Sequence, residues 1–220
     1  MAGAALALSL ATSQAQVYSA NIVGYANVVL TGNGAFTLVA NPFDDGAGNY
    51  ATNLLNSALP KKSQYLIWNG STFNVTQKTG SPAAWPATAS DQLPPGVGFF
   101  VANAATVNIT NTFVGTVAVN VGNSVTNAEP VGFTLQGSPI PYAGNIAILN
   151  QSSGDANMDF GGPLTKKSQL LTWNGSTFNV TQKTGSPALW GGTVPVGVAQ
   201  GFFVNNVSGP ATNVVETLAP

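Results

Sequence analysis

Short runs of apolar residues alternate with polar and turn residues along most of the chain. Residues 64–68 (QYLIW) and 71–76 (STFNVT) are two such runs, and Asn69-Gly70 separates them. Because Asn-Gly accepts the positive φ angles of a type I′ turn, the pattern predicts a β-hairpin in which Trp68 faces Ser71. Similar runs predict further strands at residues 25–30, 36–40, 98–102 and 106–109.

The alternation divides this hairpin into two faces, since successive side chains of a strand point to opposite sides. One face holds Gln64, Leu66, Trp68, Phe73 and Val75. The other face holds Tyr65, Ile67, Thr72 and Asn74. We call them the Trp68 face and the Tyr65 face.

The hairpin belongs to a segment that occurs twice. Residues 61–85 (KKSQYLIWNGSTFNVTQKTGSPAAW) recur as residues 166–190 (KKSQLLTWNGSTFNVTQKTGSPALW), with three differences: Tyr65/Leu170, Ile67/Thr172 and Ala84/Leu189. Two of them fall on the Tyr65 face, which favours the Trp68 face as the core face.

Weaker matches extend this repeat in both directions. Gly98-Phe99-Phe100-Val101 corresponds to Gly201-Phe202-Phe203-Val204, and Phe36-Thr37-Leu38 corresponds to Phe133-Thr134-Leu135. The repeat predicts two β modules, at residues 17–110 and 111–220. Apolar residues at helical spacing in residues 52–59 indicate one short helix per module. We therefore expect an all-β protein of two tandem β-sandwich-like modules.

The first residues resemble an export signal. Residues 4–11 are apolar, and the small residues Ser13 and Ala15 fit a signal-peptidase site, so residues 1–16 are expected to be a signal peptide. No Lys or Arg precedes the apolar run, which fits a signal peptide that lacks its basic start or, less well, a buried N-terminal segment. We expect a secreted protein, extracellular or at the cell surface, without a transmembrane segment.

Four short motifs carry a family resemblance: VYSANIVGY at residues 17–25, FTLVANP at 36–42, WNG at 68–70 and PGVGFFV at 95–101. In these motifs the chain resembles an uncharacterised family of secreted proteins from environmental bacteria. It is also similar to β-sandwich modules appended to secreted and surface proteins. The resemblance implies an extracellular β-sandwich and no reaction. The second copy departs from it, with Ser138-Pro139 in place of Asn-Pro and Ala199-Gln200 before Gly201.

The charge of the chain is low, and this removes several functional classes. Only 6% of residues are charged, against about 25% in ordinary soluble domains, and the net charge is −1. The sequence has no Arg, His or Cys. Arginine contacts to phosphate or guanine, zinc sites, disulfides and imidazole bases are therefore excluded, and we expect neither nucleic-acid binding, nor enzymatic activity, nor a cofactor.

One loop has some features of a calcium site. Asp155, Asn157 and Asp159 alternate as oxygen ligands do in calcium-binding loops. Phe160 stands where such loops need glycine, and no glutamate follows at the twelfth position. An ordinary polar loop is the favoured interpretation.

The repeated segment contains the candidate binding residues. We expect the polar ones to be solvated, and loop tryptophans can stack on sugar rings or fill the end of a core. The candidates are Lys61, Lys62, Gln77, Lys78 and Trp85, with Lys166, Lys167, Gln182, Lys183 and Trp190 in the second copy. Their recurrence indicates a surface used twice or local gene conversion.

Three functions remain open at this point. The favoured one is a secreted, non-enzymatic binding or structural protein that presents the same hairpin surface twice toward a polysaccharide or cell surface. The second is a subunit of an extracellular matrix or filament that assembles with itself. The third and least favoured is a hydrolase with an unusual carboxylate site.

Overall fold

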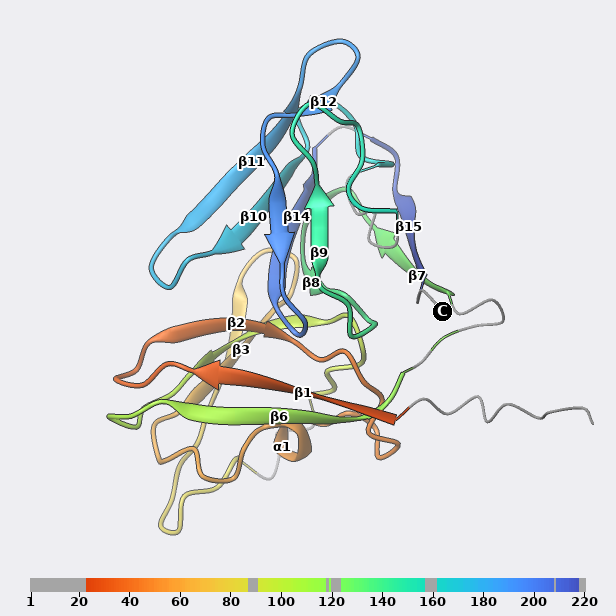
Figure 1. Ribbon diagram of the computed structural model, residues 1–220. Helices are drawn as coiled ribbons and strands as arrows, with labels where there is room; N and C mark the ends of the chain where they lie inside the picture. Colours follow the sequence, from red (N-terminus) through yellow and green to blue (C-terminus); the bar gives the residue numbers. More distant parts are fainter. Residues whose placement is uncertain are drawn as a thin grey trace, which may run out of the picture.

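The computed structural model describes residues 23–86, 91–117, 119, 124–156, 162–207 and 209–217 (Figure 1). All strand pairs between the named strands are antiparallel, which confirms the all-β fold class. Helix α1 (Ala51–Leu54) is a single turn and the only helix in these ranges, so the predicted helix at 52–59 is shorter and has no second copy there. Within the same ranges, no helix is long and apolar enough to cross a membrane.

Six strands make up the part of the chain that we call the N-terminal half, residues 23–117. A two-stranded ribbon pairs β1 (Val23–Leu30) with β6 (Ile109–Thr116). A four-stranded sheet has the order β2 (Phe36–Ala40), β5 (Gly98–Ala102), β3 (Gln64–Trp68) and β4 (Phe73–Gln77). In Figure 1, β1 and β6 lie below β2 and β3.

The C-terminal half, residues 119–217, is built in a similar way. A ribbon pairs β7 (Ser124–Glu129) with β15 (Thr212–Thr217), and a second ribbon pairs β9 (Gly144–Ala147) with β13 (Val194–Val196). A five-stranded sheet has the order β12 (Leu189–Trp190), β11 (Phe178–Thr184), β10 (Gln169–Trp173), β14 (Gly201–Asn206) and β8 (Gly132–Gly137).

We place the boundary between the halves after strand β6. This strand runs across the predicted module boundary at 110/111 and pairs along its whole length with β1. By strand pairing, residues 111–116 therefore belong with the N-terminal half. That the two halves are separate modules stays a prediction.

The hairpin turn is two residues longer than expected. Trp68 faces Phe73 and Leu66 faces Val75, so the predicted pairing of Trp68 with Ser71 is wrong. The reason is the Asn69 side chain, whose Oδ1 accepts hydrogen bonds from the backbone N–H groups of Ser71 (3.1 Å) and Thr72 (2.9 Å). Such bonding holds a wider turn closed. A shift of two residues leaves the two hairpin faces unchanged.

Buried residues form three cores in separate layers. One core lies mainly in the N-terminal half, contains Tyr65, Phe99 and Phe113, and also takes in Ile140 and Ala199 of the C-terminal half. A second core lies inside the C-terminal half and contains Leu170, Phe202 and Trp190. The third core lies between the two large sheets. Its buried residues are Leu38, Phe100, Leu135 and Phe203, two from each half.

The Tyr65 face, and not the Trp68 face, packs into the core of its own half. Tyr65 and the corresponding Leu170 are both 0% exposed, whereas Val75 on the Trp68 face is 55% exposed. Leu66, Trp68 and Phe73 pack against the third core instead. The prediction of the core face is therefore wrong, because both faces are apolar and each meets a different partner.

The Trp68 faces of the two hairpins join the halves through matching contacts. The indole Nε1 of Trp68 donates to the carbonyl oxygen of Phe133 (3.0 Å), and Nε1 of Trp173 donates to that of Phe36 (2.9 Å). The Trp68 ring also lies edge-on to Phe203 (5.5 Å), and the Trp173 ring lies edge-on to Phe100 (5.3 Å). Each hairpin thus contacts the opposite half at corresponding places, as in a two-fold interface.

Glycines allow the backbones of the two halves to touch. A Cβ atom on Gly98 would lie 2.8 Å from the Gln136 nitrogen, and one on Gly201 would lie 2.8 Å from the Val39 carbonyl oxygen. Real Cβ atoms do not approach backbone this closely. Any other residue at these two positions would force the large sheets apart.

Candidate binding groove

Six of the ten predicted binding residues lie on the surface. Four exposed lysines precede the two hairpins, and one exposed glutamine stands near the end of the second strand of each hairpin. These residues are Lys61, Lys62, Gln77, Lys166, Lys167 and Gln182. They remain available to a ligand.

The remaining two lysines are buried, so the prediction that they are solvated is wrong. Lys78 is 4% exposed and Lys183 is 2% exposed. The Lys78 ammonium donates to the carbonyl oxygens of Ser57 (2.8 Å) and Leu59 (2.7 Å). Lys183 donates in the same way to Gly162 (3.2 Å) and Leu164 (2.8 Å). Their recurrence is explained by support of the loop before each hairpin, and burial lowers the pKa of Lys78.

We expect Lys78→Met to lower the free energy of unfolding by about 2 kcal/mol, because the buried carbonyl group of Leu59 and the partly buried one of Ser57 lose their hydrogen-bond donor. Lys61→Met, at an exposed position in the same segment, serves as the control and should change stability by less than about 0.5 kcal/mol. Urea unfolding followed by tryptophan fluorescence measures both. Equal effects of the two substitutions would contradict the structural role of Lys78.

The two loop tryptophans fill core positions. Trp190 is 0% exposed and belongs to the core of the C-terminal half. Trp85 is partly buried against the N-terminal core, with its ring 5.1 Å from that of Tyr65 and 5.7 Å from the Lys78 ammonium. Trp190 therefore has no surface for stacking on a sugar, and Trp85 has little.

The proposed calcium ligands are described only in part. Asp155 accepts a hydrogen bond from the backbone N–H of Asn145 at 2.6 Å, which ties its loop to β9. Asn157 and Asp159 lie outside the described residues. Within the described ranges, no group of three or more His, Cys, Asp or Glu side chains is arranged to hold a metal ion.

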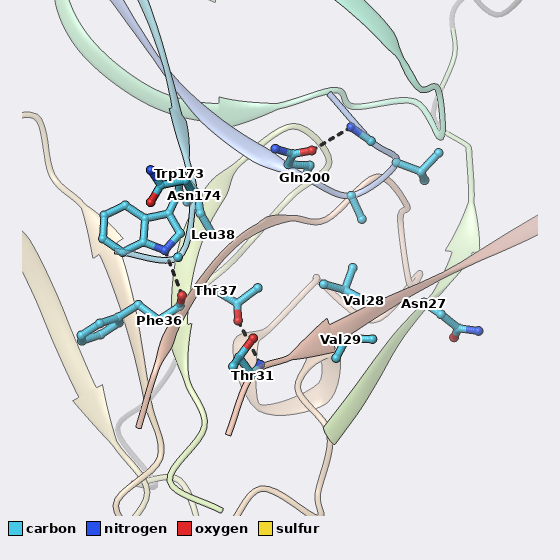
Figure 2. Close-up of a pocket in the computed structure, with 14 residues that line it drawn as sticks. Asn27, Val28, Val29, Thr31, Phe36, Thr37, Leu38, Trp173, Asn174 and Gln200 are labelled. Atoms are coloured by element: carbon cyan, nitrogen blue, oxygen red, sulfur yellow. Dashed lines mark hydrogen bonds between the residues drawn. The ribbon is translucent and has the colours of Figure 1, made fainter. Parts of the chain in front are cut away.

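A groove between the two halves has the features of a binding site (Figure 2). Its volume is about 430 Å³. One wall comes from the ends of β1 and β2 in the N-terminal half, and the other comes from the β10–β11 turn and residues 197–200 in the C-terminal half. The hydrogen bond from Trp173 Nε1 to the Phe36 carbonyl oxygen crosses the groove and connects its walls.

The lining of this groove combines aromatic rings with neutral polar groups. Phe36 is 37% exposed and Trp173 is half-buried. Amides and hydroxyls stand around them, and no lining residue is charged. The polar side chains are Asn27, Thr31, Thr37, Asn174 and Gln200.

The loop at residues 197–200 is held in place by its own contacts. Ala199 has a φ of 59°, in the left-handed region that costs a non-glycine residue about 1 kcal/mol or more. Its carbonyl oxygen accepts from Ala40 N at 2.9 Å, which fixes the loop to the N-terminal half. Gln200 Oε1 accepts from Gly197 N at 2.9 Å. The loop therefore forms a defined wall of the groove.

A second polar cluster is buried in the C-terminal half. Glu129 and Glu216 are both 0% exposed. The side-chain amide of Gln136 donates to Glu129 Oε1, and that of Asn127 donates to Glu216 Oε1 at 3.1 Å. Glu216 Oε2 forms a hydrogen bond with the Ser138 hydroxyl. In the described part of the chain, Glu129 Oε2 has no hydrogen-bond partner.

Burial favours the neutral form of Glu216, whereas its hydrogen bond with Ser138 favours the charged form. The Ser138 hydroxyl lies 2.7 Å from the Ile140 carbonyl oxygen, which can only accept. Since the hydroxyl has one proton, it can donate to Glu216 or to the Ile140 carbonyl oxygen but not to both at once. Burial raises the pKa of Glu216 to about 8 and that of Glu129 to about 7, and the Glu129 charge adds to the effect on Glu216.

The N-terminal half has apolar residues at the corresponding positions. The carbonyl oxygen of Leu30 accepts from Asn103, as that of Glu129 accepts from Asn206, so Leu30 and Glu129 correspond. The strand registers then match Phe113 with Glu216. The sequence contained a signal for the acids, since both stand at inward positions of alternating strands. The sequence contained no signal for the groove, because segments that are far apart in the chain form it.

No protein-family model, curated protein or solved structure matches this chain.

Proposed function

We propose that this chain is a secreted, non-enzymatic carbohydrate-binding protein, and that the groove between its halves receives the sugar. The observation that carries the proposal is the lining of the groove, which places aromatic rings beside uncharged amides and hydroxyls. Aromatic rings stack on the C–H faces of sugars, while amide and hydroxyl groups exchange hydrogen bonds with sugar hydroxyls.

The dimensions and charge of the groove favour a neutral glycan. A volume of about 430 Å³ lies in the range of small-molecule sites and suits a short stretch of polysaccharide. No lysine lines the groove to pair with an acidic sugar. The groove is formed by both halves, so the protein offers one composite site rather than the same hairpin surface twice.

The arrangement of acids supports a binding role without catalysis. Hydrolysis of a glycosidic bond uses two carboxyl groups that reach the substrate. Glu129 and Glu216 interact with each other, but neither has surface that a substrate could touch. No acidic residue lines the groove.

Phe36→Ala tests the groove directly. We expect a loss of affinity of about tenfold or more for the neutral glycan that binds best, since contact with a phenylalanine ring contributes about 1.5 kcal/mol or more. The measurement is calorimetric titration, after a panel of soluble and insoluble neutral polysaccharides has identified the glycan.

Phe133→Ala is the matched control. Phe133 occupies the corresponding position of the other half, is 43% exposed and lies edge-on to Phe203 at 6.1 Å, as Phe36 does to Phe100 at 6.0 Å. It does not line the groove. Retained binding by Phe133→Ala supports the proposal. Equal losses in both variants, or no glycan bound by the parent protein, would overturn it.

A further inference from the structure

Two strands with the same sequence lie at sheet edges. Strand β4 is the outermost strand of the four-stranded sheet. Strand β11 is covered by β12 at Lys183 and Thr184, and its Gln182 carbonyl oxygen also accepts from Gly191 N at 3.1 Å, so only residues 178–181 form an edge. Both strands begin with FNVTQ, at residues 73–77 and 178–182.

The phase of the hairpin shows which backbone groups point outward. In β4, Thr72 and Lys78 form hydrogen bonds toward β3, through Asn69 N to Thr72 O (3.0 Å) and Lys78 N to Ser63 O (2.8 Å). Alternate residues of an antiparallel strand bond to opposite sides. The N–H and C=O groups of residues 73, 75 and 77 therefore face away from the sheet. The same phase holds for 178, 180 and 182, but the outward carbonyl oxygen of Gln182 already accepts from Gly191 N.

The edge of β4 lacks the features that usually block edge pairing. Lysine, proline, a bulge or a covering segment commonly protects an edge strand. None of them occurs within residues 73–77, and the register with β3 is continuous. In β11, by contrast, the segment at Gly191 covers Gln182. The central valines are also exposed, Val75 at 55% and Val180 at 53%.

The sequence of the edge is complementary to itself. When FNVTQ pairs antiparallel with a second FNVTQ about a two-fold axis, valine stands opposite valine and phenylalanine opposite glutamine. The central valine, whose backbone faces outward, then exchanges two N–H···O bonds with its counterpart. No charged side chains meet, and the two exposed valines cover each other. A second copy of this chain therefore fits the edge.

We propose that two copies of this protein associate through β4, which pairs antiparallel with β4 of the other copy. The contact is two-fold, and β11 does not offer a second one because Gly191 occupies the position beside Gln182, so association stops at a dimer. The groove of Figure 2 takes no part in this contact, and this proposal is independent of glycan binding.

Sedimentation velocity over a concentration series tests the proposal with Val75→Lys, and Val180→Lys on the covered strand β11 is a matched variant. A lysine at position 75 meets another lysine across the contact. The parent and Val180→Lys are expected to form a dimer whose fraction grows with concentration, and Val75→Lys is expected to remain monomeric.

Val114→Lys is the control, since Val114 on β6 has the same exposure (53%) away from both edges. It should assemble like the parent. A parent protein that stays monomeric up to its solubility limit would overturn the proposal. So would a Val75→Lys variant that dimerises like the parent, or a control that dissociates as Val75→Lys does.

Discussion

The free energy of unfolding is expected to fall by several kcal/mol as the pH rises from about 5 to about 8, because Glu129 and Glu216 lose their protons inside the folded protein. Their folded-state pKa values, about 7 and about 8, lie above the value of 4.5 expected for an exposed glutamate. Each unit of difference corresponds to about 1.4 kcal/mol.

The sign follows from proton binding. Between pH 4.5 and pH 8 the folded state holds more protons than the unfolded state, so a rise in pH favours unfolding. The contribution of the two protonated glutamates to the free energy of unfolding is complete below the pKa of the unfolded state. It is lost as the pH rises through the two folded-state pKa values. Above about pH 8 both states are ionised, and these two groups add no further change.

Urea unfolding at a series of pH values measures this dependence. The double variant Glu129→Gln and Glu216→Gln, which keeps the shape of both side chains without a titrating proton, should lose most of the slope. Each single variant should lose part of it. A parent protein that is equally stable at pH 5 and pH 8, or a double variant with the slope of the parent, would show that the pair is not the cause.

Trp190→Ala is expected to lower the free energy of unfolding by about 4 kcal/mol, through loss of a fully buried ring and the cavity it leaves. Trp85→Ala, at the corresponding position of the N-terminal half, should cost clearly less, because Trp85 is only partly buried. Denaturant unfolding with matched m-values measures the difference.

This pair of variants also separates packing from binding. The glycan affinity of folded Trp85→Ala and Trp190→Ala should equal that of the parent, since neither ring lines the groove. A Trp190→Ala protein with the stability of the parent would contradict the buried position of this side chain.

Local patterns predicted most strands of the N-terminal half, although the strand expected at 106–109 overlaps β6 only at Ile109. The expected strands at 36–40, 64–68 and 98–102 coincide with β2, β3 and β5, because alternation and turn residues act over a few positions. The hairpin faces were also separated correctly. Which face enters which core could not be predicted, since both are apolar and the choice depends on the opposite half. Trp68 illustrates this, since its indole Nε1 donates to the Phe133 carbonyl oxygen of the opposite half at 3.0 Å.

The candidate groove could not be predicted from the sequence, because it depends on tertiary contacts. From sequence alone, a lysine is expected at the surface. Lys78 is buried because the fold brings the carbonyl groups of Ser57 and Leu59 to its ammonium group. Likewise, Phe36 and Gln200 are far apart in sequence, and only the packing of the halves places them in one groove. The low content of charged residues indicated an uncharged site, and the lining of the groove contains no charged residue.

The crossed contacts of Trp68 and Trp173 bear on how this gene can change. A substitution on one hairpin alters the surface that contacts the other half. A change in one copy alone therefore weakens the packing between the halves. Copying one hairpin segment over the other alters both sides together and keeps them matched. Repeated copying of one segment over the other would therefore keep the two segments alike, while the sequence outside this contact diverges.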